Sequence, residues 1–115
     1  MQQKVYDLEE RTLAFAKRVI AYINRLPRTL TNVEIIGQLV RASGSVGANY
    51  IEANESLGKK DFLMHIKISR KESKESRFWL QLTACKAEDE PEQRVLIQEA
   101  TELMKIFGAI LQKSM

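Results

Sequence analysis

The chain has few of the residues that build compact chemical sites. Its 115 residues include one cysteine and one histidine. Cys85 therefore cannot form a disulfide within the chain, has no partners at metal-ligand spacing, and is expected to be a buried thiol. His65 has no nearby catalytic constellation and stands outside any Glu-x-x-His motif of the di-iron bundles. We therefore predict no enzyme activity, no metal and no cofactor, with a ferritin-like bundle using Glu52, Glu72 and Glu75 as a remote alternative.

Long apolar runs are also absent. No stretch is long enough to cross a bilayer, and the opening residues MQQKVYDLEE lack the apolar region of a signal peptide, so we expect a cytoplasmic protein with no membrane partner. The length favours a single domain over residues 1–115, and 44% hydrophobic with 29% charged residues is ordinary for a globular chain. A net charge of +3 permits an anionic partner without requiring one.

Apolar residues recur at helical spacing along the first segment. From Val5 to Leu26 they alternate at steps of three and four, which predicts an amphipathic helix that Pro27 ends. A second apolar row lies beside this seam and makes the apolar face wider than one neighbouring helix needs. This row favours an oligomer and consists of Leu13, Ala16, Ile20 and Ile23.

Two glycines three apart, in ASGSVGANYIEANES, pose a choice between a phosphate-binding loop and a helix. Gly47 is not followed by the lysine and Ser/Thr of the Walker pattern, and no strand pattern flanks the stretch as a KH RNA-binding module requires. The helical rhythm instead continues through it, from a capping-box pair at Thr31 and Glu34 to Gly58. Gly44 and Gly47 are then expected to let a neighbouring helix approach closely.

Two further helices complete the predicted fold. One runs from about residue 60 to residue 86, and the other follows a break in which Asp89 and Glu92 can cap and Pro91 suits the first turn. Short connections between four such helices predict an all-α, antiparallel up-down-up-down four-helix bundle.

The centres of the second and third helices are unusually polar. An antiparallel pairing places Arg41 near two half-buried glutamates, Glu72 and Glu75, and an ion pair between them is the expected solution. The predicted structural network comprises Arg41, Ser45, Asn49, Glu52, Glu72 and Glu75, with Glu52 near His65. The first helix offers it further basic partners every seven residues, at Lys4, Arg11, Arg18 and Arg25.

Four stretches resemble the bacterial four-helix-bundle family first noted in intervening sequences of 23S rRNA genes. They are LEERTLAFAKRVI, QLVRASGSVGANYIEANES, KKDFLMHIKISRKESKES and FWLQL. The resemblance implies an antiparallel bundle that assembles as a homopentamer and has no established enzymatic activity. A relative of that family, the accessory variability determinant of diversity-generating retroelements, binds a reverse transcriptase and nucleic acid.

A basic row on the third helix suggests what the protein contacts. It is formed by Lys67, Arg70, Lys74 and Arg77, with Lys60 and Lys71 beside it. Such a row can follow phosphates, which predicts binding of RNA, DNA or a nucleic-acid enzyme. Two alternatives stay open: a solvated face whose lysines bridge to nearby glutamates, and a pure protein scaffold. Phe78 falls beside the row, where a subunit contact is favoured over base stacking.

Overall fold

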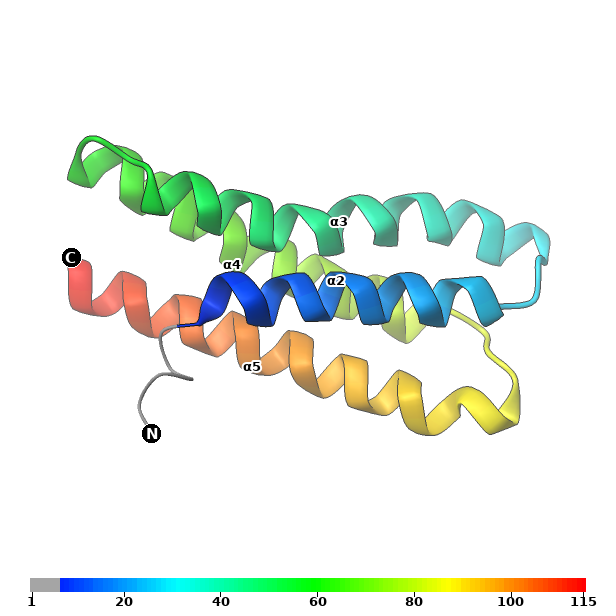
Figure 1. Ribbon diagram of the computed structural model, residues 1–115. Helices are drawn as coiled ribbons and strands as arrows, with labels where there is room; N and C mark the ends of the chain where they lie inside the picture. Colours follow the sequence, from blue (N-terminus) through cyan, green and yellow to red (C-terminus); the bar gives the residue numbers. More distant parts are fainter. Residues whose placement is uncertain (1–6) are drawn as a thin grey trace.

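The computed structural model describes residues 7–115, which form four long α-helices and one short 3-10 turn around a common core (Figure 1). The elements are α2 (Leu8–Arg25), α3 (Leu30–Asn54), α4 (Lys59–Leu82), η1 (Ala87–Asp89) and α5 (Glu90–Ser114). No strand occurs among these described residues, so the predicted all-α class is confirmed. Lys4 and Val5, which the sequence assigned to the first helix, lie outside the described residues.

The helix ends differ from the prediction at several places. The α3 helix already ends at Asn54, and Gly58, the predicted stop of that helix, is the N-cap of α4. The α3 helix is capped by Thr29, whose side-chain oxygen accepts a hydrogen bond from the backbone N–H of Asn32, so the predicted cap at Thr31 is wrong. The α4 helix ends at Leu82 and not near residue 86, because Thr83 turns to an extended backbone. Asn32 then joins these two regions, since its side chain donates to the carbonyl of Ala84 and accepts from its N–H.

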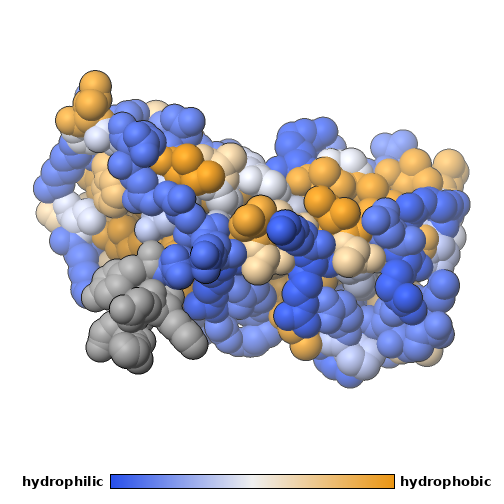
Figure 2. Space-filling model, in the orientation of Figure 1, coloured by the Kyte–Doolittle hydropathy of each residue, from blue (hydrophilic) through white to orange (hydrophobic). Residues whose placement is uncertain are grey.

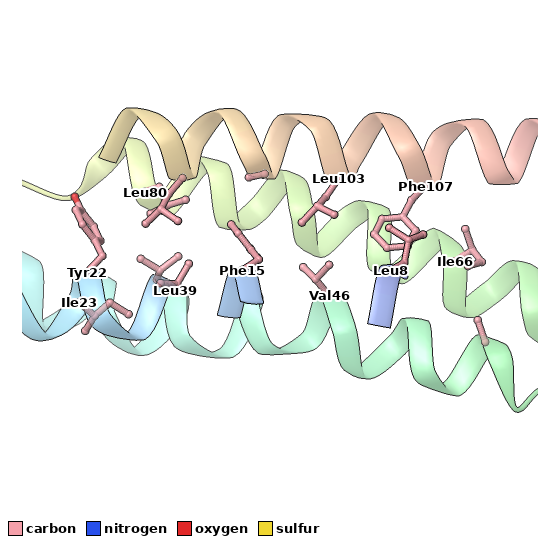
Figure 3. Close-up of a cluster of buried hydrophobic side chains, with 14 of the residues drawn as sticks. Leu8, Phe15, Tyr22, Ile23, Leu39, Val46, Ile66, Leu80, Leu103 and Phe107 are labelled. Atoms are coloured by element: carbon pink, nitrogen blue, oxygen red, sulfur yellow. The ribbon is translucent and has the colours of Figure 1, made fainter. Parts of the chain in front are cut away.

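The core is a continuous column of side chains from all four long helices (Figure 3). The predicted seam of α2 is confirmed from Leu8 to Leu26, because each described member of it is buried. At one end of the column the ring of Phe107 packs against Tyr50, with centroids 5.7 Å apart. Burial of this apolar column is the main stabilising contribution to the fold.

Small residues bring α3 and α4 together. Ser69, Ser73 and Ser76 are fully buried on α4. The Ser69 hydroxyl donates across the interface to the carbonyl of Val46, while Ser73 donates to the carbonyl one turn earlier, so each buried hydroxyl has a partner. Polar residues therefore occupy the centre of this interface without leaving unsatisfied groups among the three serines.

Only one of the two α3 glycines has the predicted role. A β-carbon on Gly47 would lie 2.7 Å from Thr12 Oγ1, so α2 crosses α3 closely at this point. Gly44 is exposed and has nothing within 4 Å of the place that a β-carbon would take, so within one chain it serves no close approach.

No helix in residues 7–115 has the length and apolar character to span a membrane.

Candidate nucleic-acid interface

The basic side chains of α4 project along one side of the helix. Spacings of three and four residues place them on adjacent turns, and over ten residues the row from Lys67 to Arg77 extends about 15 Å. Lys67, Arg70, Lys71 and Lys74 are exposed, while Arg77 is half-buried. Arg77 Nη1 lies 3.4 Å from Thr101 Oγ1, which tethers this end of the row to α5.

These side chains line a groove between α4 and α5 with a volume of about 790 Å³. The α4 wall of this α4–α5 groove is formed by Lys67, Arg70, Lys71, Lys74 and Arg77, and the α5 wall by Met104, Gly108, Leu111, Gln112 and Met115. The structure thus brings five of the six predicted contact residues together. Lys60 lies apart, in a shallow hollow that it shares with Lys67, Asp61, Leu63 and Met64.

The groove is positively charged and its charges are largely free. No acidic residue lines it. Among residues 7–115 the only ion pair made by its basic residues is a long contact of 3.9 Å between Lys71 and Glu72. A concave, one-signed surface of this kind raises the local concentration of anions. Of the lysine–glutamate bridges that the alternative of a solvated face predicts, only the Lys71–Glu72 contact occurs among the described residues.

Glu92, Glu99 and Glu102 of α5, together with Asp89 of η1, are instead directed to α2, where three arginines meet them. Arg11 binds Glu99 through both a 2.7 Å and a 2.9 Å hydrogen bond, and Arg18 binds Glu92 in the same two-pronged way. The third arginine, Arg25, lies 2.7 Å from Asp89. The sequence correctly singled out this seven-residue spacing but assigned the arginines the wrong partners, Glu72 and Glu75.

Hydrogen bonding reinforces the ionised forms of the groups in this arginine ladder, which consists of Arg11, Arg18 and Arg25 with their acidic partners. The bond to Glu99 raises the pKa of Arg11, and the bond to Glu92 raises the pKa of Arg18. Hydrogen bonds from Gln98 and then from Arg11 lower the pKa of the Glu102 carboxyl. The ladder therefore compensates the acidic side of α5, and these acidic residues do not line the basic α4–α5 groove.

A second surface of interest is apolar and lies across α2 and α3. Leu13 and Ile20 are 54% and 48% exposed and lie on the flank of α2 away from Arg11, because Ile20 follows Arg11 by two and a half turns. The outward face of α3 carries a row of small and apolar exposed residues: Val33, Gly37, Val40, Gly44, Ala48 and Ile51. Figure 2 shows hydrophobic surface gathered along the part of the molecule where α3 lies.

The sequence predicted only part of this apolar face. Of its second row on the first helix, Leu13 and Ile20 are exposed, Ala16 is half-buried and Ile23 belongs to the core. The row on α3 was missed, although its steps of three and four residues from Val33 to Ile51 were available as a signal. We call Leu13, Ile20 and this α3 row the apolar face.

Comparison with known proteins agrees with the fold. Over residues 4–109 the sequence matches the family described as 23S rRNA-intervening sequence protein. The chain belongs to this family. It is also similar to a crystal structure of a protein with unknown function from the S23 ribosomal protein family of Bacteroides thetaiotaomicron, at 25% identity, over 95% of this chain and 98% of that one, with a TM-score of 0.81. No curated protein matches the chain.

The predicted polar network is present in a reduced form, around Asn49 and His65. Asn49 donates to the carbonyl and hydroxyl oxygens of Ser45, which turns its own oxygen toward His65 Nδ1 at 3.0 Å. His65 Nδ1 therefore carries the proton, and Nε2 lies 3.6 Å from Asp61. Glu52 is exposed and makes no side-chain contact in this network.

The predicted ion pair of Arg41 with Glu72 or Glu75 is wrong. Arg41 is exposed and donates to Gln38 at 3.0 Å, and no ion pair of Arg41 occurs among the described residues. The rotation of α3 explains the error, because Arg41 lies on the exposed side of that helix; the register also differs, since Asn49 meets His65 about three residues away from the predicted alignment. Burial raises the pKa of the Glu72 carboxyl, the nearby Glu75 raises it further, and Lys71 and Arg41 only partly oppose the rise.

A second polar cluster, which the sequence did not reveal, lies at the end of the bundle near η1. The hydroxyl of Tyr22 lies 2.6 Å from that of Thr83, and Gln93 donates to both the carbonyl and hydroxyl oxygens of Thr83. Burial raises the pKa of the Tyr22 phenol. Asp89 is only 7% exposed, and its Oδ2 is buried without a hydrogen-bond partner.

Cys85 lies at the edge of this cluster, half-buried, with its sulfur 3.5 Å from Gln93 Oε1. It is therefore more exposed than the predicted buried thiol. Within residues 7–115 no group of three or more His, Cys, Asp or Glu side chains could hold a metal ion. The glutamates of the remote ferritin-like alternative, Glu52, Glu72 and Glu75, therefore form no such group among the described residues.

Proposed function

We propose that the chain is a non-catalytic cytoplasmic subunit of a homo-oligomer that binds RNA or DNA through the α4–α5 groove. The observation that carries this proposal is the charge of the groove, in which five basic residues and no acidic residue line one concavity. Such a surface binds the phosphate backbone without reading sequence, because it offers charge and no constellation that recognises base edges. A nucleic-acid enzyme carrying bound nucleic acid would reach the same surface.

The arginine ladder supports this proposal because it separates the two signs of charge. Glu92, Glu99 and Glu102 of α5 are held by α2. Their negative field is therefore largely compensated on the far flank of α5, and the α4 row faces a neutral wall instead.

The apolar face supports the oligomer. Glycine in the exposed interior of a helix costs about 1 kcal/mol relative to alanine. Gly37 and Gly44 meet nothing in their own chain that would exclude a side chain. Close approach of a second copy would give both glycines a purpose and would bury Leu13 and Ile20 as well. We propose that the assembly is a homopentamer of antiparallel up-down-up-down bundles; the contacts of Ser69 with Val46 and of Asn32 with Ala84 support that helix order.

The experiment that tests nucleic-acid binding is a fluorescence anisotropy titration with a labelled oligonucleotide at low salt. The groove variant replaces Lys67, Arg70, Lys74 and Arg77 by glutamate. The control variant makes the same charge change at exposed residues outside the groove, Lys17, Lys86, Arg94 and Lys113. Circular dichroism and light scattering establish that both variants fold and assemble as the wild type does.

Loss of binding in the groove variant alone would support the proposal. Equal binding by the two variants would place the contact elsewhere. No binding by the wild-type protein at low salt would favour the second candidate, a protein scaffold that acts through its apolar face.

A further inference from the structure

The two walls of the α4–α5 groove differ in chemistry. The α4 wall is entirely basic, whereas the accessible apolar surface of the α5 wall comes from Met104 and from Met115 just past the helix end, over the buried Leu111, with Gln112 as its one polar side chain. Met115 is 77% exposed, and Met104 is partly exposed. A ligand that fills the groove therefore meets positive charge on one side and soft apolar surface on the other.

Gly108 keeps the floor between these walls open. A β-carbon at this position would lie 3.8 Å from Arg70 Nε, which is ordinary van der Waals contact. The Arg70 side chain thus passes over the α5 backbone, where a longer side chain would stand in its path. The absence of a side chain at Gly108 leaves the guanidinium and the apolar wall accessible to the same ligand.

We propose that the groove holds a short segment of single-stranded nucleic acid, with its phosphates along α4 and its bases against the α5 wall. This inference rests on the proposed function and deepens it. A duplex carries phosphates on both strands and keeps its bases stacked inside, so the apolar wall would gain nothing from it. A single strand exposes base faces, which pack on apolar and aromatic side chains whatever the sequence, and methionine sulfur contacts aromatic rings favourably.

Phe78 extends this arrangement at the end of the basic row. It follows Lys74 by one turn and is 52% exposed. The Trp79 ring holds it in an edge-to-face contact, with centroids 5.0 Å apart and planes at 72°. A half-exposed ring that a neighbouring indole holds in place offers a stacking platform for a base that leaves the groove.

The test compares a single-stranded oligonucleotide of about 12 nucleotides with a duplex of the same length, by anisotropy on the full chain. Gly108→Leu fills the floor without changing charge, and Gly108→Ala is its matched control. We expect the wild type to bind the single strand about tenfold more tightly than the duplex, and Gly108→Leu to weaken that binding about tenfold while Gly108→Ala leaves it unchanged.

Phe78→Ala provides a second variant on an exposed residue, and it should also weaken single-strand binding with little effect on the duplex. Equal affinity for single strand and duplex, or equal behaviour of Gly108→Leu and Gly108→Ala in folded protein, would overturn the inference. In that case salt-sensitive binding that is lost in the groove variant would still uphold the proposed function. Absence of binding to either oligonucleotide would instead overturn both.

Discussion

Thr12 of α2 and Gly47 of α3 lie so close together that a β-carbon on Gly47 would be 2.7 Å from the Thr12 hydroxyl oxygen and 3.1 Å from its β-carbon. The hydroxyl cannot easily move away, because it donates to the carbonyl of Leu8 at 2.7 Å and Thr12 is buried. This contact sets how closely α2 approaches α3.

We therefore expect Gly47→Ala to lower the melting temperature, even though alanine is the better helix former. Overpacking of this kind typically costs about 1–3 kcal/mol. Adding Thr12→Ala should recover part of the loss, and a double-mutant cycle measured by thermal unfolding gives the coupling. Strictly additive effects of the two substitutions would contradict the close contact.

The N-terminus of α3 offers a test between two neighbouring threonines. Thr29→Ala removes the side-chain acceptor for the Asn32 N–H and should lower the free energy of unfolding by about 1 kcal/mol. Thr31→Ala serves as the control and should have little effect, because Thr31 is exposed and inside the helix. Denaturant unfolding measures both, and a larger loss for Thr31→Ala would restore the capping box that the sequence suggested.

Glu72 makes stability depend on pH in a defined direction. Because burial and Glu75 raise its pKa in the folded chain, the folded state holds the Glu72 proton to higher pH than the unfolded state does. Stability from this group is therefore present in acid and is lost as the pH rises between the unfolded and the folded pKa.

Glu72→Gln should consequently raise the melting temperature at about pH 7 and change it little at about pH 3, which lies below the pKa of the carboxyl in both states. Glu75→Gln, at an exposed position, should give a smaller gain. The same gain at both pH values would mean that the carboxylate charge is not its source.

The apolar face should determine the assembly state. Light scattering of the wild type should show a mass several times the 13.2 kDa of one chain. Ile20→Glu places a charge in the apolar face and should shift the mass toward that of one chain, whereas Leu57→Glu, at a fully exposed residue in the turn between α3 and α4, should not. A monomeric wild type would contradict the proposed interface.

Most of the fold could be predicted from the sequence because helix periodicity reports burial directly. The positions from Leu8 to Leu26 that recur at three and four residues are the ones that the core contains. The basic row of α4 was visible for the same reason. The family resemblance predicted the same fold independently. The match to the family over residues 4–109 confirms that resemblance.

What the sequence could not specify is which side chain meets which across helices. A shift of about three residues along α3 and α4 brings Asn49 to His65, and the rotation of α3 turns Arg41 outward to Gln38 in place of a glutamate. Likewise the spacing of Arg11 and Arg18 indicated an ion-pair edge, but helix rotation decides that this edge faces α5. The neutral α5 wall of the groove depends on the same rotation, so the groove itself could not be predicted.

The salt dependence of oligonucleotide binding tests the central claim most directly. If the four residues of the groove variant contact phosphates, the logarithm of the wild-type association constant should fall linearly with the logarithm of salt concentration, with a slope of about −3 on a single strand. The control variant should keep this slope, and the groove variant should lose it. Absence of wild-type binding at low salt, or the same slope in both variants, would contradict the claim that the α4–α5 groove binds nucleic acid.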